Sequence, residues 1–261
     1  MILVPQTLAN TPAIKSSFDS FGVCHITDVF GSAYIEELGN ESDRLWERQS
    51  ERTEKNLRIG LRQDLQGNTV LDRLDPVMDI SATFAALNQN TDLLKLAEHL
   101  LGQKVFAMKE KLVFKRPGTG GFGLHRDANY FSSSGAGGCE IVTIAVVLDD
   151  FNSRNGPIQF YPQLRQKNLK APTGEPRDID CSEIQNIEPL APLAKAGEIL
   201  VFDGLIPHRS DYNHSTMPRR LYMITYIPAS YRHGREDYYR QRLIEQRRER
   251  QLAEGDDAIF C

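Results

Sequence analysis

The sequence of 261 residues has few cysteines and no long apolar run. Cys24, Cys139, Cys181 and Cys261 lack CxxC spacing, which argues against a zinc-binding module and favours reduced thiols. No segment approaches the roughly 20 apolar residues that a membrane-spanning helix requires, and residues 1–7 lack the basic start and apolar core of a secretory signal. These absences predict a cytoplasmic protein with no membrane partner.

The chain also has no large excess of charge of either sign. The chain has 31 basic and 35 acidic residues, for a formal net charge of −4. Proteins that bind nucleic acid usually show a concentrated positive charge, so no nucleic-acid partner is expected. The length suits one domain with a sizeable core, and we predict a single domain over residues 1–261. The oligomeric state is left open.

The first 103 residues are predicted to be mainly helical support for that domain. Apolar residues recur at helical spacing over residues 33–50 and 80–101, and Gly102 is a suitable stop for the second helix. At the other end, residues 229–261 are dense in Arg, Glu and Gln. Their composition indicates a helix with a solvated charged face, followed by a tail.

Between these ends, short runs rich in Val, Ile, Phe and Tyr alternate with turn residues, which is typical of antiparallel β-structure. Strands are expected at residues 105–114, 140–148, 158–162, 198–202 and 219–227. The pattern predicts an α+β fold whose core, residues 104–228, is a double-stranded β-helix, the cupin-like jelly roll. A long polar insert at residues 166–192 is expected to lie over one mouth of the barrel.

A candidate metal site begins at His125 and Asp127, directly after a glycine-rich turn. In an extended segment, side chains at positions i and i+2 point to the same face, so one ion can take both an imidazole and a carboxylate. His208 follows a later strand and is the expected third ligand, with His214 as its rival. Two histidines and one carboxylate on one face leave positions open for a cosubstrate and O₂, as in non-haem Fe(II) oxygenases.

A cation is then needed for the distal carboxylate of a 2-oxo acid cosubstrate. Arg219 lies eleven residues after His208, at the start of a predicted strand, and its planar guanidinium can bind a carboxylate through two hydrogen bonds. Alternation along that strand would direct Arg219 into the barrel and Arg220 outward. Ser210 could add a hydroxyl group to the same site.

Together these residues resemble the phytanoyl-CoA dioxygenase-like family of Fe(II)/2-oxoglutarate-dependent oxygenases. The resemblance covers about residues 104–228 and is carried by residues 114–131, 142–150, 155–162 and 208–219. It implies a jelly roll with His125, Asp127 and His208 as the catalytic iron ligands, and Arg219 with Ser210 holding 2-oxoglutarate. Lys111, on the strand before the first ligand, is our candidate for a further cosubstrate contact.

The resemblance also implies the reaction, in which a substrate C–H bond is hydroxylated while O₂ and 2-oxoglutarate are converted to succinate and CO₂. The carboxylate of Asp127 favours hydroxylation over halogenation. Substrate contacts are expected from Arg126, Asn129, Tyr130 and the loop at residues 132–138, which follow the first ligand. Nearby basic residues favour a small polar or anionic substrate such as an amino acid, a betaine-like compound or an aminoalkylphosphonate.

Two other functions are compatible with the same residues. The protein could be a cupin-like isomerase or hydrolase that uses another divalent ion, or a catalytically silent jelly-roll binding module in which His125 and Asp127 only make structural hydrogen bonds. Turnover of 2-oxoglutarate separates the first from an oxygenase, and stoichiometric iron binding separates the second.

Overall fold

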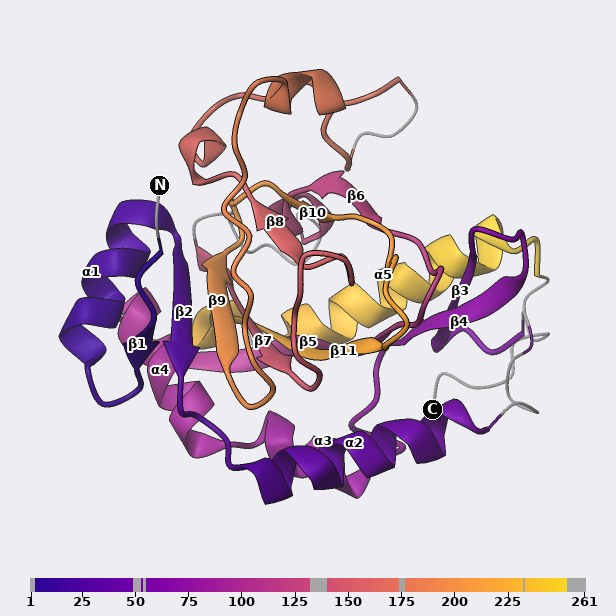
Figure 1. Cartoon of the computed structure of the whole chain (residues 1–261), viewed down its shortest axis with the longest axis horizontal. Helices are drawn as coiled ribbons and strands as arrows, with labels where there is room; N and C mark the ends of the chain where they lie inside the picture. Colours follow the sequence, from indigo (N-terminus) through magenta and orange to yellow (C-terminus); the bar gives the residue numbers. More distant parts are fainter. Residues whose placement is uncertain are drawn as a thin grey trace.

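The computed structural model (Figure 1) describes residues 3–48, 53, 55–131, 140–173, 177–231 and 233–252. Within those ranges, no helix is both long enough and apolar enough to cross a membrane. The predicted loop at residues 132–138, Cys139 and residues 253–261 of the predicted tail lie outside the described residues.

The larger of two sheets forms the centre of the fold, with strand order β1-β2-β9-β7-β11-β5-β4-β3. Its long central strands pair antiparallel, which suits their apolar sequences. The strands are β1 (Gln6–Thr7), β2 (Val23–Thr27), β3 (Ile59–Gln63), β4 (Thr69–Leu74), β5 (Val105–Lys115), β7 (Val142–Val147), β9 (Ile199–Asp203) and β11 (Arg219–Pro228).

A second sheet of three short strands completes the barrel, in the order β6-β10-β8. These strands are β6 (Phe122–His125), β10 (His208–Ser210) and β8 (Ile158–Phe160). Phe160 of this sheet packs against Phe202 of the larger one, with ring centroids 5.1 Å apart, within an apolar cluster that fills the space between the sheets. The predicted double-stranded β-helix is therefore confirmed.

Helices cover the outer face of the larger sheet, as Figure 1 shows for α2 and α3 below it. A second apolar cluster joins these helices to the sheet and includes Phe84, Leu96 and Tyr222. These helices are α1 (Thr11–Phe21), α2 (Ser32–Trp46), α3 (Ala82–Asn88) and α4 (Thr91–Leu101). A fifth helix, α5 (Gly234–Glu249), packs elsewhere, through Tyr238 and Tyr239, in an apolar cluster with Met108 and Ile227.

The N-terminal region differs from the prediction in having strands among its helices. Strand β2 pairs antiparallel with β9, and the hairpin β3–β4 extends the sheet beyond β5. The sequence gives little sign of β2, because all but the last of its five residues are buried and the strand shows no alternation of apolar and polar residues. Nε2 of its His25 lies 2.6 Å from Oε2 of Glu198.

The predicted helix at residues 80–101 is two helices, because Asn90 interrupts it. The Asn90 side chain accepts hydrogen bonds from the backbone N–H groups of Asp92 and Leu93, which caps α4 at its N-terminus. Gly102 then ends α4 in the left-handed conformation (φ 69°), as predicted.

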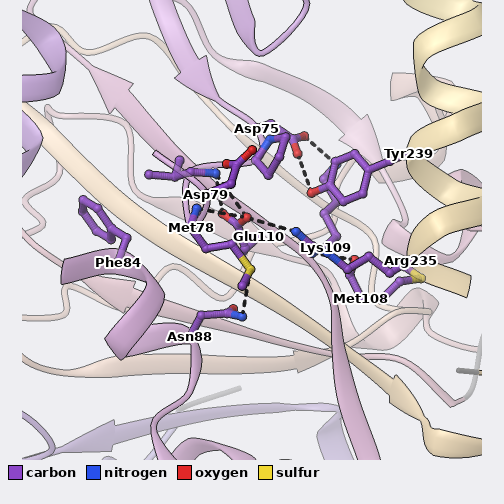
Figure 2. A network of polar contacts seen from close by, with 12 residues as sticks. Asp75, Met78, Asp79, Phe84, Asn88, Met108, Lys109, Glu110, Arg235 and Tyr239 are labelled. Atoms are coloured by element: carbon purple, nitrogen blue, oxygen red, sulfur yellow. Dashed lines mark hydrogen bonds and ion pairs between the residues drawn. The ribbon is translucent and has the colours of Figure 1, made fainter. Parts of the chain in front are cut away.

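Helix α5 is attached to β5 by the polar network in Figure 2. Asp75 forms an ion pair with Lys109 at 3.1 Å and accepts a hydrogen bond from the hydroxyl group of Tyr239 at 3.0 Å. Arg235 donates to the backbone carbonyl of Met108 at 3.0 Å. Predicted to be a solvated helix, α5 is instead held against the barrel through one side.

Glu110 lies at the centre of this network and is fully buried. Its carboxylate accepts hydrogen bonds from the backbone N–H groups of Val77 and Met78, at 2.9 and 3.4 Å, and from the hydroxyl group of Tyr222 at 3.3 Å. Burial, and then the negative charge of Asp75, raise the pKa of Glu110 to about 7. Arg235 and the backbone donors oppose this shift only in part.

The raised pKa of Glu110 predicts a pH-dependent stability. Because the folded protein holds this proton more tightly than the unfolded chain, the resulting stabilisation is full below the ordinary pKa of about 4.5 and is lost as pH rises to about 7. Glu110→Gln removes this titration. We expect the free energy of unfolding of the variant, relative to wild type, to rise with pH across that window, by at most about 1.4 kcal/mol per pH unit. Urea unfolding at a series of pH values measures this difference, and a difference independent of pH would contradict the assignment.

Candidate active site

His125, Asp127 and His208 come together at one end of the barrel. The pairing of β6 with β10 sets His125 directly opposite His208, with ring centroids 4.3 Å apart. The Nε2 atoms of both histidines lie 3.8 Å from Oδ1 of Asp127, and one ligand atom from each of the three residues falls within 4.8 Å of the others. The side chains are 13, 10 and 6% exposed in that order. This triad suits one ion with open coordination positions, and it contains His208 rather than His214.

Hydrogen bonds fix how the triad presents its ligand atoms. Nδ1 of His125 lies 2.7 Å from the carbonyl oxygen of Gly123, and Nδ1 of His208 lies 2.9 Å from that of Ile206. A carbonyl oxygen can only accept, so each Nδ1 carries the proton and each Nε2 has a free lone pair for a metal. Thr143 donates to Oδ2 of Asp127 at 2.6 Å and leaves Oδ1 facing the histidines.

The electrostatic surroundings keep these ligands in the protonation states that a metal requires. The pKa of His125 is lowered to about 3, mainly by burial. Burial also lowers the pKa of His208. Burial by itself would raise the pKa of Asp127, but His208 and Lys111 outweigh it and lower the value to about 2. Two neutral imidazoles and one carboxylate result, which is the donor set of non-haem Fe(II) sites.

A narrow slot leads from the triad along β5 and β11 to Arg219. Its walls include Lys111, Val113, Leu221 and Ser210. Arg219 is 1% exposed, and its Nη2 atom donates to the carbonyl oxygen of Gly156 at 3.0 Å. The Nε atom of Arg219 is buried without a partner in the described part of the chain. Burial lowers the pKa of this guanidinium to about 10, so it remains charged at neutral pH, and its spare donors fit a dicarboxylic cosubstrate.

A larger cavity of about 330 Å³ lies beside His125 and Asp127 of the triad, with α5 and the insert among its walls. Helix α5 contributes one of its faces to the wall, through residues spaced as i, i+3, i+4 and i+7: Tyr238, Gln241, Arg242 and Glu245. The insert contributes Arg177 and Asp178 to the wall. Arg177 donates two hydrogen bonds to Glu245 of α5, one of them 2.8 Å long, and so joins the insert to the helix.

Of the residues predicted to contact substrate that the structure describes, one lines the cavity and two do not. Tyr130 lines the cavity, and its hydroxyl group donates to Asp178 at 3.1 Å. Arg126 points instead to the start of the insert, where it donates to the backbone carbonyls of residues 164 and 165, just before it, and of residue 167 within it. Asn129 donates to the carbonyl of Arg177, also in the insert, at 3.0 Å. Neither Arg126 nor Asn129 is among the described residues that line the cavity. Their contacts position the insert.

The cavity residues of α5 and of the insert were not among the residues predicted to contact substrate. Their sequence signal is weak, because a helix dense in Arg and Glu is usually solvated and a loop carries no periodicity. Tyr238 and Tyr239 were the available sign, since adjacent aromatic residues in a charged segment indicate a buried face.

Comparison with known proteins decides the family. The model of the family described as phytanoyl-CoA dioxygenase (PhyH) matches residues 18–221. The chain belongs to this family. It is therefore a non-haem iron dioxygenase with 2-oxoglutarate as cosubstrate, and the triad supplies the expected two histidines and one carboxylate.

Several proteins of known activity or structure are similar to this dioxygenase. A 2-aminoethylphosphonate dioxygenase from uncultured bacterium HF130_AEPn_1 is 25% identical over 245 residues, which cover 93% of this chain and 91% of the relative. A methylphosphonate hydroxylase from Gimesia maris is 29% identical over 141 residues, which cover 54% and 52%. The crystal structure of EctD from S. alaskensis with 2-oxoglutarate and 5-hydroxyectoine superposes with a TM-score of 0.71 at 20% identity, covering 84% and 76%.

The hydrogen bond from Thr143 to Asp127 predicts a measurable role in metal affinity. Thr143→Val keeps the shape of the side chain but leaves Oδ2 of Asp127 without its donor, so the carboxylate loses its fixed orientation. We expect Fe(II) affinity to fall by about 10- to 100-fold. Anaerobic calorimetric titration measures it. Thr143→Ser retains the hydroxyl group and is the matched control, and equal affinities in all three proteins would show that the contact has no such role.

Proposed function

We propose that this dioxygenase hydroxylates a C–H bond of a small anionic molecule bound in the cavity beside the triad, with release of succinate and CO₂. His125, Asp127 and His208 would hold the iron, which together with 2-oxoglutarate and O₂ supplies the oxidising chemistry. An anionic substrate is proposed because basic side chains outnumber acidic ones on the cavity wall.

Basic residues outnumber acidic ones on that wall, and one of the four acidic residues, Asp127, belongs to the triad. The six basic residues are Arg62, Arg73, Lys109, Lys111, Arg177 and Arg242. Several are already paired, as Lys109 is with Asp75. Lys111 forms none of the ion pairs found in the described residues; its Nζ atom lies 5.7 Å from the ring centroid of Phe122. An anion in the cavity would offset this unpaired charge.

Lys111 also borders the slot, so it lies between the proposed cosubstrate and substrate. Burial, and then the charge of Lys109, lower the pKa of Lys111 to about 8, and an anion on either side would favour the charged ammonium. We assign Lys111 to the cosubstrate site, with Arg219 and Ser210 holding the distal carboxylate. The two relatives named for phosphonates support an anionic substrate.

The cytoplasmic location expected from the sequence stays a prediction.

The cosubstrate assignment is tested by anaerobic addition of Fe(II) and 2-oxoglutarate to the protein. Chelation of iron by a 2-oxo acid gives a weak visible charge-transfer band, which we expect in wild type and not in Asp127→Ala. Arg219→Met replaces the guanidinium with an apolar chain of similar length. We expect it to weaken 2-oxoglutarate binding by at least about 30-fold, because a buried carboxylate would lose its charged partner. A wild-type protein that binds iron without forming the band would refute the proposal.

The substrate class is tested by succinate release above the background without substrate. The panel contains 2-aminoethylphosphonate, methylphosphonate, amino acids and betaines, each with an ester or amide that lacks the negative charge of its acidic group as its matched control. We expect stimulation by at least one compound with its acidic group free, no stimulation by the matched ester or amide, and a product that has gained one oxygen atom by mass spectrometry. Stimulation confined to the esters and amides would refute an anionic substrate.

A further inference from the structure

A buried lysine, Lys115, lies beside Ser210 and Arg219, two of the polar residues that line the slot. Strands β5 and β11 are paired so that Lys111 lies opposite Met223, Val113 opposite Leu221, and Lys115 opposite Arg219. Alternate residues of a strand share one face, so these three pairs succeed one another along the slot. Lys111 lies at the metal end of the slot and Arg219 at the far end, with Lys115 next to Arg219 on the neighbouring strand.

The side chain of Lys115 is satisfied entirely by neutral acceptors. The residue is 1% exposed, and Nζ lies 2.8 Å from Oγ of Ser210 and 3.1 Å from the carbonyl oxygen of Gly156, with a third contact to the carbonyl oxygen of Asp211. Lys115 takes part in none of the ion pairs formed by described residues. Burial, and then the charge of Arg219, lower the pKa of Lys115 to about 5. A carboxylate bound beside Arg219 would favour the charged ammonium, which has enough donors for all three acceptors, and this points to a role in binding an anion.

The contact with Ser210 determines where that hydroxyl group can donate. A serine hydroxyl has one proton and two lone pairs. Lys115 donates to Oγ of Ser210, and the backbone N–H of Phe122 also donates to it at 3.4 Å. Both lone pairs of Oγ are then engaged, so the hydroxyl proton must point in the one direction that is left. Ser210 lines the slot, so its hydroxyl is presented as a donor to a ligand there.

The carbonyl oxygen of Gly156 links Lys115 to Arg219. Both side chains donate to this one oxygen, at 3.1 and 3.0 Å, which ties the position of the guanidinium to that of the lysine. Gly156 has a φ of 66°, and a Cβ there would lie 2.3 Å from the carbonyl oxygen of Asp211 and 2.7 Å from Nζ of Lys115. Only glycine allows this approach.

We propose that Lys115 is a positioning residue of the cosubstrate site. It orients the Ser210 hydroxyl as a donor and, through the carbonyl of Gly156, fixes the guanidinium of Arg219, so that both groups meet the distal carboxylate of 2-oxoglutarate. This inference rests on the proposed function, because it takes 2-oxoglutarate to lie in the slot.

The test compares Lys115→Met, Ser210→Ala and the double variant in 2-oxoglutarate titrations of the Fe(II) protein. Methionine fills the space of the lysine chain without its donors. We expect Lys115→Met to raise the KM and Kd for 2-oxoglutarate by about tenfold, with kcat at saturating cosubstrate and Fe(II) affinity within about twofold of wild type. Since Lys115 acts in part through Ser210, the double variant should be less impaired than the product of the single effects. An unchanged affinity for 2-oxoglutarate in Lys115→Met, or independent effects that multiply, would overturn the proposal.

A 2-oxo acid without a distal carboxylate separates this role from a general loss of structure. Pyruvate can chelate iron but cannot reach Ser210 and Arg219, so its weaker affinity should be the same in wild type and Lys115→Met. An equal loss for both acids would mean that the variant disturbs the barrel and would overturn the positioning role. If Lys115→Met does not fold, Lys115→Gln tests the same point: its shorter amide should weaken 2-oxoglutarate binding several-fold, and an unchanged affinity would overturn the proposal.

Failure of this inference and failure of the proposed function give different results. If wild type forms no charge-transfer band with 2-oxoglutarate, the oxygenase assignment itself falls. If wild type forms the band and Lys115→Met binds 2-oxoglutarate equally well, only the role of Lys115 falls.

Discussion

The antiparallel pairing of β6 with β10 is the interaction on which the rest of the site depends. It sets His125 directly opposite His208, so that two imidazoles from distant parts of the chain face one point. Asp127 follows two residues after His125 and completes the triad. A register shift of one residue in this short pairing would turn one histidine to the opposite face of the sheet, and the metal site would be lost.

The barrel surrounds this triad with two spaces of different character. The slot along β5 and β11 is narrow and partly apolar, with Lys111 at one end and Arg219 at the other, which suits a rigidly held dicarboxylate. The cavity under α5 and the insert is wider and lined mainly by charged side chains. Lys111 borders both spaces, so the cosubstrate and substrate sites share one charge, and binding of one anion would alter the electrostatic environment of the other.

Burial makes the polar contacts of these spaces effective. Arg219, Lys115 and Glu110 are each 1% exposed or less, and each is held by directional hydrogen bonds. In such surroundings a displaced donor is not replaced by water, so small changes in position have large effects on binding. The same condition explains why Arg126 and Asn129 serve the insert: their contacts with backbone carbonyls hold the loop that supplies Asp178 to the cavity.

The sequence by itself determined the features that local geometry sets. The spacing of His125 and Asp127, the capped end of α4 at Gly102, and the alternation that directs Arg219 inward all follow from the period of a strand or helix. Tertiary structure alone decided the rest. The pairing of β2 with β9, the face of α5 that covers the cavity, and the meeting of Lys115, Ser210 and Gly156 join residues from distant parts of the chain. Which distant residues meet depends on strand register and on the burial of competing surfaces, and no short stretch of sequence carries that information.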